Sequence, residues 1–241
     1  MDELVKQWSV MQVQLATKVI HMDRYSLREI EYIAGLDTSF DTLNPDRACA
    51  TLVVFRYPSY GTLDKNTKPV FIAHRPIRGF PIPYISGYLG VREVPIYREL
   101  IDLFRGKVGS SAKTVYMVDG CGILHPRGLG SASHLGVEGD IPTIGVSKTL
   151  MCIDGLDETT IKEAASKLLL GDTTELRGSS GVLHGSAMNT SMKPIYVSVG
   201  HCVSLDTAIQ IIRVVSNYRI PEPIRQADIL SREQLRMATA V

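Results

Sequence analysis

A short apolar strand that ends in a carboxylate and continues into a glycine-rich loop constrains this 241-residue chain more than any other feature. Residues Thr114–Val118 are apolar and rich in β-branched side chains, which predicts a buried strand, and Asp119 follows directly. The next stretch, 120–137, is rich in glycine and also contains His125 and Arg127. Glycines let a ligand approach main-chain groups closely, so this stretch suits a polar ligand, although glycines also serve plain turns.

A second carboxylate interrupts another apolar strand. Residues Tyr32–Phe40 form an apolar run broken by Asp37, and a buried carboxylate needs a charged partner or a metal. Two further strands, Ala48–Tyr57 and Val70–Arg75, follow on either side of a turn rich in polar residues, proline and glycine. Three consecutive strands predict an antiparallel meander. Apolar residues at helical spacing predict a helix over 2–24 ahead of it.

Helices and strands alternate in the rest of the chain. Leu89–Phe104 reads as a helix in which Pro95 is expected in the first turn, so that Glu93 lies near the helix N-terminus and can face the sheet. Further helices are expected at 157–170, 204–217 and 231–237, and further strands at 141–146, 182–188 and 195–199. This order predicts an α/β fold with one central, mixed, five-stranded sheet, in which an antiparallel meander is followed by parallel strands and helices flank the sheet. We expect one domain over 1–241, with Asp37 and Asp119 on neighbouring strands.

Composition excludes several classes of protein. Hydrophobic residues at 44% and charged residues at 21% are typical of a globular protein, and no apolar run approaches the roughly 18 residues of a membrane helix. The four cysteines lack a C-x-x-C pair, which predicts reduced thiols, no zinc site and a cytoplasmic location, with the nucleus also open. The net charge of +1 gives no global sign of an anionic partner. Local groups of arginine and tyrosine suit nucleic acid but also fit a solvated surface.

The acidic residues suggest metal-dependent chemistry. Asp37 and Asp119, with Glu93 approaching from a helix, would form an oxygen-rich cluster of the kind that Mg²⁺ or Mn²⁺ prefers. Such a cluster suits phosphodiester hydrolysis, in which Lys148 at the end of a buried strand can neutralise charge on phosphorus. Glu93 could instead complement the helix dipole. The sequence contains no dinucleotide fingerprint, hydrolase elbow or Walker loop that would favour another reaction.

Two histidines are further candidates for this site. His125 and His201 could move a proton during hydrolysis, or they could be buried polar residues with satisfied hydrogen bonds.

Several stretches together resemble the endonuclease V family. They are IAGLDTSF, PYISGYLGVREVP, VDGCGILHPRGLGSASHLGV, PTIGVSK, VSVGH and RIPEPIRQADI, in that order, and they span residues 31 to 228. The resemblance implies an RNase H-like fold and a Mg²⁺-dependent endonuclease, with Mn²⁺ expected to substitute. It also implies cleavage at the second phosphodiester bond 3′ to a deaminated purine, which leaves 3′-hydroxyl and 5′-phosphate ends.

The resemblance assigns roles residue by residue. Asp37 and Asp119 match the family's metal ligands, and Glu93 matches its third acidic residue. Lys148 and His201 match its catalytic lysine and late histidine. Tyr84 matches the family's wedge, which separates the strand around the extruded base. Gly120, Cys121 and Gly122 match the loop whose main chain reads hypoxanthine. The expected substrate-binding residues are Pro83, Tyr84, Ile85, Ser86, Gly87, Gly120, Cys121, Gly122 and His125, with Ser86 standing where the bacterial motif has proline.

The near-neutral charge and the RIPEPIRQADI segment look more like the animal branch of the family, which acts chiefly on inosine in RNA. We therefore expect a monomeric endonuclease whose partner is inosine-containing single-stranded RNA. Repair of deaminated DNA by the same chemistry is the closest alternative, and an inactive nucleic-acid-binding module is a more distant one.

Overall fold

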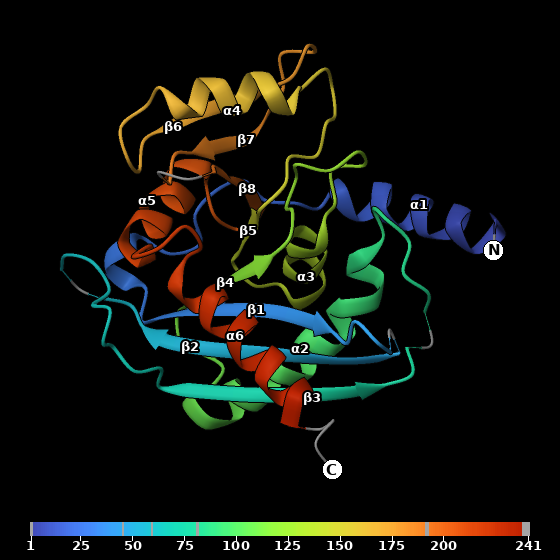
Figure 1. Ribbon diagram of the computed structural model, residues 1–241, viewed down its shortest axis with the longest axis vertical. Coiled ribbons are helices and arrows are strands. Elements are labelled where there is room, and N and C mark those ends of the chain that lie inside the picture. Colours follow the sequence, from blue (N-terminus) through green and yellow to red (C-terminus); the bar gives the residue numbers. More distant parts are fainter. Residues whose placement is uncertain (1, 45, 59, 81, 191–192, 238–241) are drawn as a thin grey trace.

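The computed structural model describes residues 2–44, 46–58, 60–80, 82–190 and 193–237, and one mixed sheet organises them (Figure 1). The strands are β1 Tyr32–Phe40, β2 Arg47–Arg56, β3 Phe71–Arg78, β4 Thr114–Asp119, β5 Thr143–Ser147, β6 Thr173–Arg177, β7 Leu183–Met188 and β8 Ile195–His201. Their order across the sheet is β3-β2-β1-β4-β5-β8-β7-β6.

The middle of the sheet places the two predicted aspartates at one end. β1, β2 and β3 form the expected antiparallel meander, while β4 lies parallel to β1 on its other side. Leu36 is paired with Val118, so Asp37 and Asp119, the next residues on each strand, emerge at the same edge of the sheet. The prediction that these carboxylates lie on neighbouring strands is confirmed.

The expected number of strands, five, is wrong, because the sheet has eight. β8 pairs antiparallel with β5, and the antiparallel strands β7 and β6 extend the sheet beyond it. β6 was missed because only Leu176 of its five residues is buried, so the strand has a weak hydrophobic pattern.

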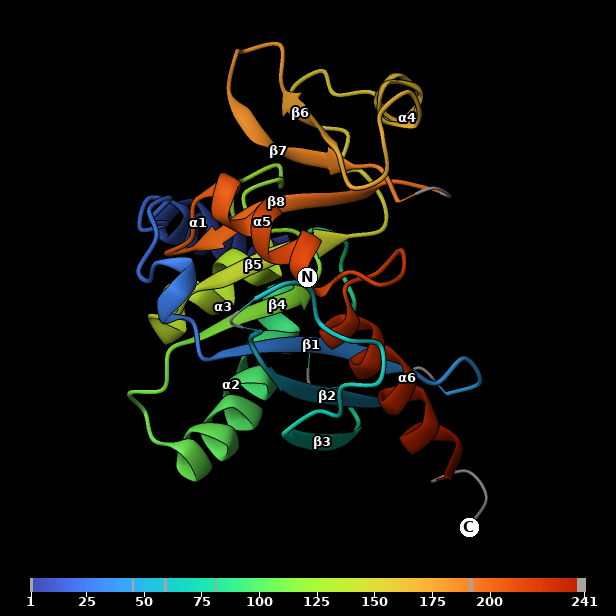
Figure 2. The ribbon, with the colours of Figure 1, turned by 90° about the vertical axis from the view of Figure 1, so that its left-hand side faces the viewer.

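Helices cover both faces of the sheet. They are α1 Asp2–Ala16, α2 Leu89–Val108, α3 Ser131–Gly139, α4 Glu158–Ser166, α5 Leu205–Val215 and α6 Glu222–Met237, with a 3₁₀ turn, η1, at Leu27–Glu29. α5 and α6 pack on the core that contains Ile33 and Met117, whereas α2 and α3 pack on the core that contains Leu36 and Val118. Figure 2 shows α2 and α6 on opposite sides of β1 and β2. Within the described ranges, no helix has the length and apolar character needed to cross a membrane.

Several helix boundaries differ from the predictions. α1 ends at Ala16 rather than near residue 24, and α6 begins at Glu222 rather than at 231. α3 follows the glycine loop directly and was not predicted. Pro95 lies inside α2, whose first turn contains no acidic residue, so Glu93 belongs to the second turn. It therefore does not complement the free amides at the start of this helix.

One glycine allows α6 to lie directly on the sheet. A Cβ atom at Gly35 would lie 2.1 Å from the carbonyl carbon of Pro223, so no other residue fits there without a shift of the backbone. This contact brings the C-terminal half of α6 across the end of β1.

Candidate active site

The edge where β1 and β4 end contains a cluster of carboxylates. Asp37 is 7% exposed, and Asp119 is half-buried at the end of β4. Because side chains alternate along a strand, both face the side covered by α6, which contributes Asp228. These three residues and Lys148 line a cavity of about 780 Å³. Glu93, 3% exposed, approaches from α2 on the other side.

The carboxylates raise one another's affinity for positive charge. Burial raises the pKa of Asp37 to about 8, and the negative charges of Asp119 and Asp228 add to the effect of burial. Burial also raises the pKa of Glu93 well above its usual value, and the charge of Asp37 contributes. The cluster therefore holds protons at neutral pH unless another cation replaces them.

Lys148 is the basic member of the cluster. Its Nζ lies 2.5 Å from Oδ2 of Asp119, just beyond the end of β5. Burial disfavours its charge, but the neighbouring carboxylates, Asp119 first, outweigh burial and raise the pKa of Lys148. Lys148 therefore stays protonated next to the cavity.

The donor set fits a hard divalent cation. Oδ2 of Asp37 and Oε2 of Glu93 are buried without a hydrogen-bond partner among the described residues. Buried carboxylate oxygens without partners are costly, and an all-oxygen set is what Mg²⁺ or Mn²⁺ prefers. Asp37, Glu93, Asp119 and Asp228 are the residues that could hold such an ion.

Asp228 is a member of the cluster that sequence reasoning missed. Asp228 forms an ion pair with Arg232, four residues later on the same helix, and its Oδ1 lies 2.7 Å from Nη2 of Arg232. That spacing is typical of a solvated helix surface, so nothing local in the sequence marks Asp228 as part of a site. Its approach to Asp37 depends on the packing of α6 over β1.

A buried tyrosine supports Glu93. Tyr97 is fully buried one turn later on α2, and the influence of its hydroxyl on Glu93 opposes the rise in the pKa of that carboxyl group. The same hydroxyl accepts a hydrogen bond of 3.0 Å from Oγ1 of Thr38, the residue after Asp37. Tyr97 thus lies between Glu93 and the end of the strand that carries Asp37.

The structure does not bring His201 to the carboxylates. β8 runs antiparallel to β5, so His201 pairs with Thr143 at the start of β5, whereas Asp119 lies beside Val146 near its end. Nδ1 of His201 accepts a hydrogen bond of 3.2 Å from the amide of Ile20. The expected position of His201 was wrong because the direction of its strand cannot be read from local sequence.

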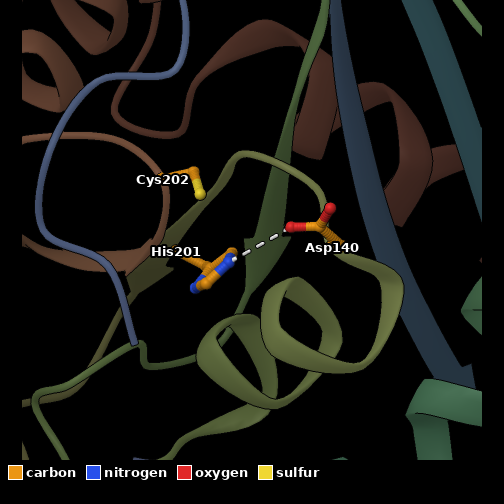
Figure 3. A group of neighbouring side chains, drawn as sticks. All are labelled: Asp140, His201 and Cys202. Atoms are coloured by element: carbon orange, nitrogen blue, oxygen red, sulfur yellow. Dashed lines mark ion pairs between the residues drawn. The ribbon is translucent and has the colours of Figure 1, made fainter. Parts of the chain in front are cut away.

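His201 instead belongs to a group with Asp140 and Cys202 (Figure 3). Its Nε2 lies 3.8 Å from Oδ1 of Asp140. Potential ligand atoms of the three residues lie within 4.8 Å of one another, but Arg24 donates hydrogen bonds to both Asp140 and Cys202. A guanidinium already supplies the positive charge at this position, and the group fastens the segment after α1 to the sheet.

The proposed wedge loop has a fixed base and an exposed tip. Tyr84 is 66% exposed, Pro83 and Ser86 are exposed, and Ile85 is half-buried. Gly87, with a φ of 80°, turns the chain back towards α2. Its carbonyl accepts hydrogen bonds from three side chains, those of Gln12, His125 and Arg127. The base of the loop is thereby held against α1 and the glycine loop.

His125 acts as a structural link in this arrangement. It is 4% exposed, and burial, followed by the nearby charge of Arg127, lowers its pKa to about 4. Its Nδ1 accepts from the amide of Arg127 at 3.3 Å, so Nε2 carries the proton and donates to the carbonyl of Gly87 at 3.0 Å. Both ring nitrogens are therefore occupied within the protein.

The glycine loop after Asp119 packs tightly against its neighbours. The amide of Gly120 donates to the carbonyl of Val146, and the amide of Gly122 donates to Oγ of Ser198. The carbonyl of Cys121 accepts from Ala132. These amide and carbonyl groups already form hydrogen bonds within the protein. A bound base would have to share those hydrogen bonds or bind to neighbouring main-chain groups instead.

Comparisons with known proteins agree with this arrangement. The Endonuclease V family model matches residues 13–229. Endonuclease V of Mus musculus is 39% identical over 98% of this chain and 70% of its own length, and that of Homo sapiens is 37% identical over 98% and 84%.

Solved structures extend the likeness to the fold. The catalytic domain of human Endonuclease V superposes with a TM-score of 0.89 at 37% identity, covering 100% of this chain and 99% of that one. Ciona intestinalis Endonuclease V, solved with a 23mer DNA containing an inosine followed by a ribo-adenosine, gives a TM-score of 0.89 at 32% identity, with 99% of each chain covered. The expected RNase H-like architecture is confirmed by these likenesses. A match over nearly the whole chain, in both sequence and fold, means that the chain belongs to the endonuclease V family.

Proposed function

We propose that this endonuclease V family nuclease cleaves inosine-containing RNA at the second phosphodiester bond 3′ to inosine, and leaves 3′-hydroxyl and 5′-phosphate ends. The observation that carries the proposal is the cluster of Asp37, Glu93, Asp119 and Asp228 beside a protonated Lys148, in a chain of this family. Ionised carboxylates without a cation repel one another and repel a phosphate, so a bound metal ion would let this cluster accept a phosphodiester in its ionised form.

In this proposal the four carboxylates hold Mg²⁺, for which Mn²⁺ can substitute. Such an ion would supply Lewis-acid chemistry towards a phosphoryl oxygen and a water molecule. Lys148 lies at the rim of the same cavity and balances negative charge that develops on the phosphate. Tyr97 holds the Glu93 carboxylate in one orientation.

Tyr84 takes the role of the wedge. An exposed aromatic ring on a loop whose base is fixed by Gly87 can stack against the bases that flank an extruded inosine. Stacking of this kind tolerates any neighbouring base, so selectivity for inosine must come from the pocket that receives the base.

The preference for RNA rests on the resemblance of the near-neutral chain and its RIPEPIRQADI segment to the animal branch of the family. The Ciona intestinalis protein was solved with a ribo-adenosine directly after the inosine, which makes a 2′-hydroxyl at that position the contact to test here.

Matched oligonucleotides test the proposal. RNA, DNA, and DNA with one ribonucleotide after inosine are each incubated with excess enzyme and Mg²⁺, alongside the same strands with adenosine in place of inosine. We expect fast single cuts in the inosine strands with a ribonucleotide, and little cleavage with adenosine. Equal rates on all-deoxy and RNA strands would instead support the DNA-repair alternative, and no cleavage of any strand would overturn the proposed activity.

A further inference from the structure

Arg92 carries a buried positive charge whose hydrogen-bond donors are not all paired within the described residues. It precedes Glu93 on α2 and is 8% exposed. Its Cζ lies 3.8 Å from the centroid of the Phe80 ring and 4.9 Å from that of Phe40. Among the described residues its Nε has no hydrogen-bond partner. Contacts with aromatic rings satisfy the face of a guanidinium but not the donors around its rim.

The acidic groups around Arg92 do not supply those hydrogen bonds. Glu93 and Asp46 act on Arg92 only through their charge, without a hydrogen bond to it. Glu93 is directed to the carboxylate cluster, and Asp46 is exposed, so water screens its charge.

A second cavity lies at this guanidinium. It has a volume of about 350 Å³ and is lined by Phe40, Asp46, Phe80, Ile82, Pro83, Tyr84 and Arg92. Phe40 also lines the carboxylate cavity, so the two cavities adjoin. A strand with its scissile phosphate at the carboxylates can therefore pass Phe40 and enter the cavity of Arg92 beneath the Tyr84 loop.

We propose that Arg92 binds a backbone phosphate of the substrate strand, next to the scissile phosphate, in this second cavity. The proposal rests on the proposed function and adds a subsite to it. A phosphate fits better than a base because Phe80 already covers a face of the guanidinium, while its in-plane N–H groups match two phosphoryl oxygens. A phosphate contact carries no sequence information, so this subsite positions the strand and leaves base selection to other groups.

The salt dependence of binding tests this subsite. Arg92→Gln, Arg92→Lys and the control Arg98→Gln, an exposed arginine on the same helix, are compared on a single-stranded inosine RNA with Ca²⁺ in place of Mg²⁺. We expect roughly tenfold weaker binding for Arg92→Gln, equally for inosine and adenosine strands. The slope of log affinity against log salt, between about 50 and 200 mM, should fall by about 0.7 for the loss of one phosphate contact. Arg92→Lys should keep the slope, and Arg98→Gln should change neither quantity.

Neutral linkages locate the phosphate. Methylphosphonates are placed at one linkage at a time in the same RNA. One position should weaken binding of the unaltered protein but have no further effect on Arg92→Gln. Independent losses at every position, or an unchanged salt slope in Arg92→Gln, would show that Arg92 only holds Phe40 and Phe80 together.

The test still works if Arg92→Gln does not fold, and it separates failure of the subsite from failure of the proposed function. If Arg92→Gln does not fold, as judged by its thermal transition, Arg92→Lys takes its place in the methylphosphonate comparison. A lysine keeps the charge but lacks the planar fork, so a methylphosphonate at the Arg92 linkage should weaken binding of Arg92→Lys less than it weakens binding of the unaltered protein, while the losses at all other linkages stay the same. Equal losses in the two proteins at every linkage would overturn the subsite. A protein that fails to cleave inosine RNA yet shows the linkage effect would refute the proposed function and leave the subsite standing.

Discussion

Replacing Asp37 with asparagine should stabilise the metal-free protein, although it should abolish cleavage. The side chain is 7% exposed and its carboxylate faces other negative charges, so the ionised form is unfavourable in the folded state. Its pKa is raised from 3.8 to about 8. A carboxyl group with a higher pKa in the folded state favours folding most below pH 4, and its contribution is lost as the pH rises towards 8.

The size of the effect follows from the shift. At pH 7.5 a shift from 3.8 to about 8 corresponds to about 5 kcal/mol of destabilisation, which is an upper limit. Hydration and movement of the side chain relieve part of it, so we expect Asp37→Asn to gain about 1 to 3 kcal/mol. For a chain of this size, each kcal/mol raises the melting temperature by roughly 2 to 4 °C.

Thermal or urea unfolding in EDTA, from pH 5 to pH 8, measures this gain. The advantage of Asp37→Asn should grow with pH across this window, and Asp102→Asn, an exposed position on α2, should show neither gain nor trend. Added Mg²⁺ should then stabilise the unaltered protein more than the variant, because a ligand of the folded state adds stability according to its affinity. A variant that is less stable than the unaltered protein in EDTA at every pH would refute the reasoning, since it would show that Asp37 gains more from Lys148 than it loses to burial.

Further predictions address the other residues of the site. Asp228→Asn should lower Mg²⁺ affinity by at least roughly 10- to 100-fold and slow single-turnover cleavage; an unchanged Mg²⁺ titration would remove Asp228 from the ligand set. Tyr97→Phe removes the hydroxyl that orients Glu93 and should raise the Mg²⁺ concentration for half-maximal cleavage with little change in the rate at saturating Mg²⁺, a pattern that a general packing defect would not give. Tyr84→Ala should weaken RNA binding by about 1 to 3 kcal/mol per stacked base, and a loss confined to the saturated rate would contradict the wedge role. His125 should contribute a loss of up to about 3 kcal/mol of stability as the pH falls from 6.5 to about 4, opposite in sign to the contribution of Asp37, because the unfolded His125 takes up a proton that the folded ring cannot. His125→Gln should flatten that slope in acid unfolding curves, and an identical slope would show that other groups cause it.

The sequence predicted the parts of the site whose signal is local. Asp37 and Asp119 each stand where an apolar strand should contain no charge, and the parallel pairing of β1 and β4 brings them together as expected. The meander could be read from three apolar runs separated by turn residues.

The parts that failed depend on long-range packing. His201 ends an apolar strand as Asp119 does, but β8 runs in the opposite direction and places that end at the other edge of the sheet. Asp228 looks like an ordinary surface residue with an i,i+4 partner, and only the close approach of Pro223 to Gly35 brings it over β1. Neither the direction of a strand within the sheet nor the position of a helix on it can be predicted from the neighbouring sequence.

The docking of α6 on Gly35 also fixes when the active site comes into being during synthesis. Asp37 leaves the ribosome almost two hundred residues before Asp228, and closing so long a loop waits until both partners are available. The sheet can form from earlier residues while the cluster still lacks its last carboxylate. A nascent chain is therefore an incomplete nuclease, and its carboxylate cluster is whole only after α6 has emerged and packed.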